Sequence, residues 1–267
     1  MKDRVKATGV TIQLPEFSHS PIDIHSHFNH GSPCDTPETY AHIRALEHVI
    51  AGYNRFGIYY AGMSTFASVV YHPECVVEEN EYLHDLVKKT DWMYQWVVID
   101  PRQERTYEQA KKMLAHPKVL GIKIHPTYHG YDILDYGDEL FSFAERHKAV
   151  LLMHPQHVEQ MAQLADKYPD MKLIIAHLGS TEQVDAIANA RNGNIYADTS
   201  ARGCALNNIV EYAVQRVGSE KILFGTDTYS CAFSYPRIAL AELPMEDKEN
   251  ILWKNALRLF PDAFDGQ

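Results

Sequence analysis

The sequence lacks several features that would assign a protein to a class at once. It holds 25 Lys and Arg against 35 Asp and Glu, with a net charge of −10, and no basic stripe that would suit nucleic acid. No stretch approaches the roughly 18 to 20 apolar residues of a membrane span, and residues 1–14 lack the apolar run of a signal peptide. We therefore expect no nucleic-acid partner and no membrane partner, with a cytoplasmic location as the default.

Cysteine is also scarce. Its four residues are widely separated and none forms a CxxC pair, which argues against a local redox motif or thiolate zinc site. We interpret them as free thiols that act as small buried hydrophobic residues. They are Cys34, Cys75, Cys204 and Cys231.

What is present is a composition typical of a globular protein. The 267 residues are 45% hydrophobic and 22% charged, enough to bury a sizeable core. No linker or composition break divides the chain. We expect one domain over residues 1–267.

Eight short apolar runs recur along the chain. Each is rich in β-branched and aromatic residues and flanked by Gly, Pro or Asp, which is typical of strands covered on both faces. Segments with helical periodicity lie between them, including residues 106–116, 138–148, 207–218 and a closing helix at 244–260. The runs fall within residues 21–27, 57–65, 93–100, 119–126, 149–155, 172–179, 194–200 and 222–229.

This alternation leaves an open doubly wound sheet or a closed (β/α)8 barrel. A dinucleotide-binding sheet should carry GxGxxG after its first strand, and PIDIHSHFNHGSPC does not. The sequence therefore predicts a single α/β domain with a (β/α)8 TIM-barrel fold.

Polar residues gather at the predicted carboxyl ends of the strands, where barrel enzymes place their chemistry. Strand seven ends in Asp198-Thr-Ser200, with Arg202 two residues beyond. The other strand ends carry His25 and His27, Lys123 and His125, His154, His177 and Asp227.

Alternation along a strand predicts that Asp23, His25 and His27 share the barrel interior, while Ile22 and Ile24 face the helices. An HxH pair can present two imidazoles to one cation, and other strand ends can complete the ligands that zinc prefers at about 2.0 to 2.2 Å. One strand-end histidine alone is more often a hydrogen-bonded core residue. Several at one end favour a metal site, because each buried imidazole would otherwise need its own partner.

The remaining histidines serve as a contrast. Several fall in helical segments among polar neighbours, and we interpret them as solvated surface residues. They are His42, His48, His84, His116 and His147.

The ordered set DIHSHF, GIKIHP, LLMHP, IIAHLG and LFGTDT resembles the amidohydrolase superfamily, in its amidohydrolase-2 branch of metal-dependent hydrolases and decarboxylases. The resemblance runs from about Asp23 to Phe260. It implies a distorted (β/α)8 barrel with a divalent metal, most often zinc and sometimes manganese.

Carried over by position, the resemblance implies metal ligands at His25, His27, His154 and Asp227. His177 matches a strand-six histidine that stands beside water or substrate in one-metal members and is a ligand in two-metal members.

Lys123 matches a strand-four position. A lysine at this position is carboxylated in some two-metal members of the superfamily. In the amidohydrolase-2 branch, the side chain at this position often contacts substrate instead. One ion is favoured, with two left open.

A cation held in this way would lower the pKa of bound water from 15.7 toward about 7. Asp227 would act as general base, and His177 would bind the developing oxyanion or shuttle the proton. Lys123, His125 and Arg202 would form a rim for a small anionic substrate, since Arg offers carboxylates a bidentate fork. Equally open is that Lys123 only neutralises the mouth and Arg202 pairs with a nearby acid.

The first functional hypothesis is hydrolysis of a C–N or C–O bond in a small, carboxylated carbonyl compound. The alternative is a decarboxylase or hydratase that uses the same residues. A third hypothesis, a non-catalytic binding scaffold, is disfavoured by the acid–base group beside the predicted metal. A homo-oligomer is an expectation by analogy only.

Overall fold

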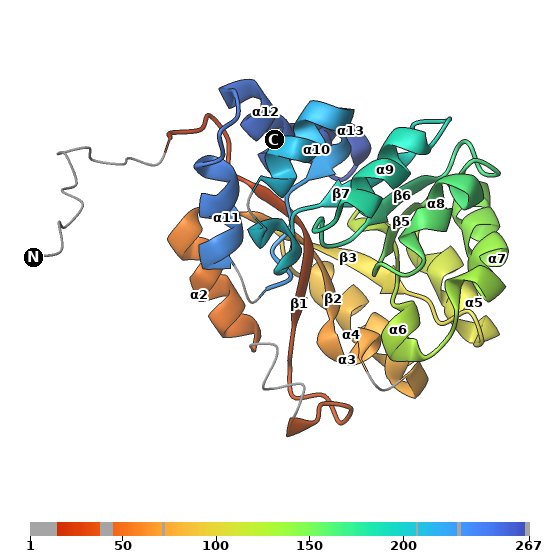
Figure 1. The fold of residues 1–267 in the computed structure, drawn as a ribbon. Helices are drawn as coiled ribbons and strands as arrows, with labels where there is room; N and C mark the ends of the chain where they lie inside the picture. The colour runs from red at the N-terminus through yellow and green to blue at the C-terminus, as the bar shows by residue number, and fades with distance from the viewer. Residues whose placement is uncertain (1–14, 38–44, 71–72, 207, 229–230, 265–267) are drawn as a thin grey trace, which may run out of the picture.

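The computed structural model describes residues 15–37, 45–70, 73–206, 208–228 and 231–264. Within them, eight parallel strands pair in sequence order around a nearly closed barrel with helices outside it (Figure 1). The predicted (β/α)8 barrel is confirmed, and the doubly wound alternative is wrong. The strands are β1 (Ile22–Phe28), β2 (Tyr60–Thr65), β3 (Met93–Val98), β4 (Val119–Ile124), β5 (Val150–Met153), β6 (Lys172–Ile175), β7 (Ile195–Asp198) and β8 (Ile222–Leu223).

The helices cover the outer face of the strands, so nearly every strand residue is buried. This two-sided burial explains why the strands are continuous apolar runs instead of alternating ones. The helices are α2 (Leu46–Phe56), α3 (Phe66–Val69), α4 (Val76–Val87), α5 (Glu104–Met113), α6 (Pro126–His129), α7 (Ile133–Arg146), α8 (Val158–Ala165), α9 (Thr181–Asn189), α10 (Ile209–Val217), α11 (Cys231–Ala239), α12 (Met245–Glu249) and α13 (Asn255–Leu259).

Local signals set several helix ends. Helix α2 stops at Gly57, whose φ of 66° suits a residue without Cβ. Helix α9 begins with a capping box in which the Ser180 side chain accepts from the Gln183 backbone and the Gln183 side chain accepts in return. Such caps satisfy backbone N–H groups that have no partner inside the helix.

The predicted closing helix is interrupted by a π-helical turn over Asn250–Lys254, between α12 and α13. Its wider winding suits two buried asparagines five residues apart. Asn250 Nδ2 donates to Ser219 Oγ (3.0 Å), and Asn255 Nδ2 donates to the backbone oxygens of Ser219 and Ile222 (2.8 Å each). These bonds hold the segment that enters β8.

Strand β1 does not alternate regularly. Its register against β2 shifts between Asp23 and Ser26, and both side chains contact the Tyr53 hydroxyl of α2, at 2.7 and 2.6 Å. The prediction that Asp23 shares the interior face with His25 and His27 is therefore wrong. An irregularity of this kind turns successive side chains away from simple alternation.

The seam between β8 and β1 is joined by individual bonds. In the described residues, the strand pairing runs from β1 to β8 without a β8–β1 ladder. Instead the backbone oxygen of His25 accepts from the N–H groups of Thr226 (3.2 Å) and Asp227 (2.8 Å). Asp23 accepts from the Thr226 hydroxyl (2.5 Å), and Thr228 Oγ1 lies 2.8 Å from Ser26 Oγ. The seam thus fixes the backbone on both sides of Asp227.

The loop that follows β1 is clamped to α4. Cys34 and Cys75 form a disulfide with Cα atoms 6.6 Å apart. His30 Nε2 lies 2.8 Å from Glu79 Oε2, and the His30 ring stacks on Tyr82 at 3.7 Å. The prediction of free thiols is wrong for this pair, whose 41-residue separation gave no local signal. Disulfides are unusual in the cytosol, so the cysteines give no support to a cytoplasmic location.

The other two cysteines, Cys204 and Cys231, are buried thiols, as predicted. Among the histidines predicted to be solvated, His48 is exposed, and His116 and His147 are partly exposed. His84 is buried against Gln95 Oε1 (2.8 Å), so that prediction is wrong. His42 lies outside the described residues.

Candidate active site

A small cavity of about 70 Å³ opens at the carboxyl ends of the strands. It brings together all of the predicted site residues except Arg202. Phe66 and Val69 of α3 supply an apolar wall, and Tyr128, which is 39% exposed, stands at the edge. The polar lining consists of His25, His27, Lys123, His125, His154, His177 and Asp227.

Two imidazoles and one carboxylate form the centre of this cavity. His25 Nε2 and His27 Nε2 are 3.2 Å apart, and Asp227 Oδ1 lies 3.9 and 3.4 Å from them respectively. All three residues are at most 5% exposed. They offer one ligand atom each within 4.8 Å of one another, a spacing suited to one metal ion.

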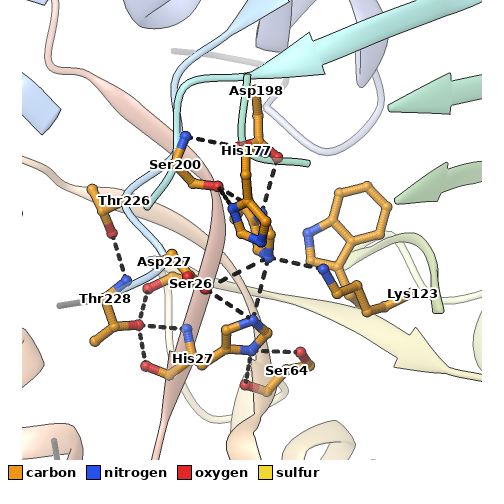
Figure 2. Close-up of polar contacts among 12 residues, drawn as sticks. Ser26, His27, Ser64, Lys123, His177, Asp198, Ser200, Thr226, Asp227 and Thr228 are labelled. Carbon is orange, nitrogen blue, oxygen red and sulfur yellow. Dashed lines mark hydrogen bonds and ion pairs between the residues drawn. The ribbon is translucent and has the colours of Figure 1, made fainter. Parts of the chain in front are cut away.

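The opposite nitrogens of both rings are already engaged. His25 Nδ1 lies 2.9 Å from the Asp198 carboxylate, and His27 Nδ1 lies 2.9 Å from Ser64 Oγ and 3.2 Å from Ser64 O (Figure 2). Because a carboxylate only accepts, His25 carries its proton on Nδ1 and directs an Nε2 lone pair at His27. At His27 the Ser64 carbonyl, which also only accepts, favours the same tautomer.

In that tautomer the two Nε2 lone pairs repel each other, and a cation bound by both nitrogens would remove the repulsion. Ligand bonds of about 2.0 to 2.1 Å with angles of about 90 to 109° place two nitrogens about 2.8 to 3.4 Å apart, which includes the observed 3.2 Å between His25 and His27. Burial first, and the nearby Lys123 charge second, hold the pKa of His25 well below its ordinary value. The rings are therefore neutral, as metal ligands must be.

The backbone at Asp227 is left-handed, with φ of 52°, and Thr228 follows at 66°. Such conformations are costly for residues with a Cβ, and they persist where surrounding bonds over-determine them. Here the Asp227 N–H donates to His25 O (2.8 Å), and Thr228 Oγ1 accepts from His27 N (2.5 Å). The strained turn brings the carboxylate toward the two histidines.

His154 reaches the cavity but not this three-residue centre. Its ring stacks on His125 at 3.9 Å and meets the His177 ring edge-on at 5.2 Å. In the described residues, its nitrogens do not belong to either group of ligand atoms within 4.8 Å. The structure thus assembles three of the four predicted ligands and places the fourth in the cavity wall.

His177 lies over His25, with ring centroids 5.0 Å apart. Its Nδ1 is 2.7 Å from Ser200 Oγ, and its backbone is left-handed, with φ of 63°. The same Ser200 oxygen is 3.0 Å from His25 Nδ1. The two rings therefore share contacts with the end of β7.

Lys123 brings a buried amine into the cavity. Its Nζ lies 2.9 Å from His25 Nε2, the nitrogen that faces His27. Burial lowers the pKa of Lys123 to about 8, while the charges of Asp198 and Asp227 oppose that shift. An amine of this kind is able to meet an anionic group of a substrate.

Arg202 does not reach the cavity. It is exposed, beyond the end of β7, after a left-handed turn at Ala201 with φ of 55°. His125, by contrast, lines the cavity, is 5% exposed, and accepts from the Tyr128 N–H through Nδ1 (3.2 Å). Of the residues predicted to contact substrate, Lys123 and His125 line the cavity and Arg202 does not.

Sequence reasoning gave no role to Asp198, Ser200 and Ser64, which orient the imidazoles. Asp198 and Ser200 stand at the end of β7 and Ser64 is near the end of β2, so their strand-end positions were a usable signal. Their short polar side chains did not stand out because such residues are common in turns.

A sequence model of the amidohydrolase family matches residues 22–261. The chain belongs to the amidohydrolase family. No curated protein matches this amidohydrolase significantly. Among its described residues, no helix has the length and apolar character needed to cross a membrane.

Solved structures resemble this amidohydrolase at low sequence identity. A dihydroxybenzoic acid decarboxylase from Polaromonas sp. JS666, with bound manganese and the inhibitor 2-nitroresorcinol, has a TM-score of 0.70 at 16% identity, over 91% of this chain and 97% of its own. The 2,6-dihydroxybenzoate decarboxylase from Rhizobium has a TM-score of 0.71 at 13% identity, over 91% and 98%. A candidate 2-pyrone-4,6-dicarboxylic acid hydrolase from Pseudomonas putida has a TM-score of 0.67 at 13% identity, over 94% and 99%.

Proposed function

We propose that this amidohydrolase is a metal-dependent hydrolase that cleaves a C–N or C–O bond of a small, carboxylated carbonyl compound. The observation that carries the proposal is that His25 Nε2 and His27 Nε2 lie 3.2 Å apart, with the Asp227 carboxylate beside them. Two neutral imidazoles and one carboxylate form a donor set of the kind found in catalytic metal sites that keep an open position.

His25, His27 and Asp227 would hold the ion, with His154 as the predicted fourth ligand. A divalent ion there would supply Lewis acidity and make hydroxide available at neutral pH. One ion is favoured because Asp198 of the second possible group, His25–His177–Asp198, already accepts from His25 Nδ1. Zinc was the sequence expectation, whereas a neighbour holds manganese, so both ions belong in the test.

The chain's own residues then have distinct tasks. Asp227 accepts the proton of the attacking water and later returns it to the leaving group. Lys123 pairs with the carboxylate of the substrate, and His177 faces the developing negative charge. Phe66 and Val69 exclude water from one side of the cavity.

A second candidate function is decarboxylation of a carboxylated aromatic compound. It is supported by the solved structures that resemble the chain, several of which are decarboxylases of hydroxylated benzoates. In that reaction Asp227 or His177 would deliver a proton to the ring carbon that loses carbon dioxide. The same cavity residues would serve, so only the products separate the two reactions.

Metal analysis is the first experiment. Purified protein should contain about one equivalent of zinc or manganese, and a His27→Ala variant should contain much less. A content below about a tenth of an equivalent, with no uptake after addition of either ion, would contradict the proposed function.

Product analysis is the second experiment. The protein is screened against carboxylated lactones, esters and amides and against hydroxybenzoates, with acid release and carbon dioxide release measured in parallel. Formation of a new carboxylic acid without carbon dioxide supports hydrolysis. Carbon dioxide release without a new carboxylic acid supports the second candidate. A Lys123→Met variant should raise KM for carboxylated substrates more than for their uncharged analogues, whereas the exposed Lys88→Met serves as a control.

A further inference from the structure

The end of strand β7 supplies two buried polar side chains next to the candidate metal site. Asp198 and Ser200 are both fully buried. Figure 2 draws their contacts with the neighbouring imidazoles. The chemistry of these contacts decides where the ring protons lie.

Asp198 accepts on both of its oxygens. Oδ1 receives the backbone N–H groups of Ser200 (2.8 Å) and His177 (3.3 Å), and Oδ2 lies 2.9 Å from His25 Nδ1. Since a carboxylate only accepts, His25 carries its proton on Nδ1. A separate contact agrees with this, because Lys123 Nζ lies 2.9 Å from His25 Nε2 and donates to a lone pair there.

Ser200 can donate one proton. Its Oγ is 3.0 Å from His25 Nδ1, which already carries hydrogen, so the hydroxyl proton does not go there. The remaining contact is His177 Nδ1 at 2.7 Å, which must then be the acceptor. His177 consequently carries its own proton on Nε2, the nitrogen away from Ser200.

We propose that Asp198 and Ser200 are positioning residues that impose opposite tautomers on two neighbouring histidines. Asp198 makes His25 a ligand through Nε2, and Ser200 makes His177 an Nε2–H donor. In the proposed reaction, on which this last role rests, His177 donates a hydrogen bond to the developing oxyanion and does not bind a second ion.

The opposite arrangement would leave a buried group without a partner. If His177 bound metal through Nε2, its Nδ1–H would donate to Ser200. Both imidazoles would then donate to Ser200 Oγ. Among the described residues, these two rings are the side-chain partners of Ser200 Oγ, so its hydroxyl proton would have no acceptor. Burying an unpaired hydroxyl is unfavourable, so the structure favours the donor tautomer.

Nitrogen NMR tests the assignment without any substrate. Protein labelled with ¹⁵N-histidine is examined after removal of metal with EDTA and again after addition of zinc, and the His177 signals are assigned from a His177→Gln variant. We expect His177 protonated on Nε2 and His25 protonated on Nδ1 in both forms. A Ser200→Ala variant should lose the preference at His177, and Ser200→Thr, which keeps the hydroxyl, should retain it.

Zinc affinity separates the two positioning residues. Asp198→Asn can donate to His25 Nδ1, so it should lower the affinity about 10- to 100-fold. Ser200→Ala should leave it within about threefold of the wild-type value and lower kcat more than it raises KM. Thermal unfolding of Ser200→Ala at the wild-type temperature would show that loss of the fold does not cause its lower kcat, and Ser200→Thr should retain the wild-type kcat.

Three results would overturn the proposal: His177 protonated on Nδ1 in the wild type, an unchanged His177 tautomer in Ser200→Ala, or an Asp198→Asn variant that binds zinc as tightly as the wild type. Failure of the proposed function gives a different pattern. If the wild type takes up neither zinc nor manganese, the metal-stripped protein still reports both tautomers.

Discussion

The disulfide between Cys34 and Cys75 should make a large contribution to stability. It closes a segment 41 residues long, which contains β2 and part of the cavity wall. The chain-entropy relation for a loop of this length gives about 4 kcal/mol at 25 °C, gained by restricting the unfolded chain. A Cys34→Ser/Cys75→Ser variant should therefore lose about 4 kcal/mol in its free energy of unfolding.

The native fold should survive this change. From the loop after β1, His30 and Ser32 still contact Glu79 of α4, at 2.8 Å for the His30 pair, and the His30 ring still stacks on Tyr82. Urea unfolding followed by tryptophan fluorescence measures the loss. A thiol assay in denaturant provides the chemical control, because the oxidised wild type should react at two cysteines, Cys204 and Cys231, and the reduced protein at four.

Reduction of the wild type is the matched comparison. Dithiothreitol should lower its stability to about that of the double variant and leave the double variant unchanged. The reasoning is refuted if the double variant lies within about 1 kcal/mol of the oxidised wild type, or if the reductant affects both proteins equally. In either case the covalent bond does not restrict the unfolded chain as calculated.

Three further changes probe the site and its support. Asp227→Asn removes the carboxylate beside His27 and should abolish turnover. It should also lower zinc affinity at least about tenfold, as measured by competition with a chelating dye. Full activity of this variant would contradict the role of Asp227 as base. Gly203→Ala would place a Cβ 2.5 Å from the carbonyl oxygen of His177 and should cost about 1 to 3 kcal/mol in thermal unfolding. Burial would raise the pKa of Glu79, but hydrogen bonds led by that from His30 hold it below its ordinary value. The wild type should therefore melt at a higher temperature than Glu79→Gln near pH 6, and the difference should vanish as the pH falls well below about 4. A gap between the two melting temperatures that stays constant with pH would contradict this assignment.

The order of strands and helices was predictable because each strand is buried on both faces and so leaves an apolar run in the sequence. The convergence of His25, His27 and Asp227 was predictable for a related reason: parallel strands end at one face of a barrel. Their distances of 3.2 to 3.9 Å are a property of the folded chain that no run of letters displays.

Other features depend on contacts between distant segments. The outward turn of Asp23 depends on Tyr53 of α2 and a shift of register, neither of which alternation can show. Cys34 can bond to Cys75 only when the fold brings together the loops after β1 and β2, which lie far apart in the sequence. The position of Arg202 shortly after β7 predicts a place at the cavity, but the left-handed turn at Ala201, which lies between them, leaves no signal in the sequence.

The short strand β8 has a consequence for how cation binding and folding are linked. His25 and His27 belong to the first strand, whereas Asp227 follows the last, so an ion bound by all three would cross-link the two ends of the sheet. Free ion at 100 times its dissociation constant would add about 2.7 kcal/mol to the free energy of unfolding. The amide hydrogens of Thr226 and Asp227, which cross this gap to His25, should then exchange with solvent more slowly once the ion is bound.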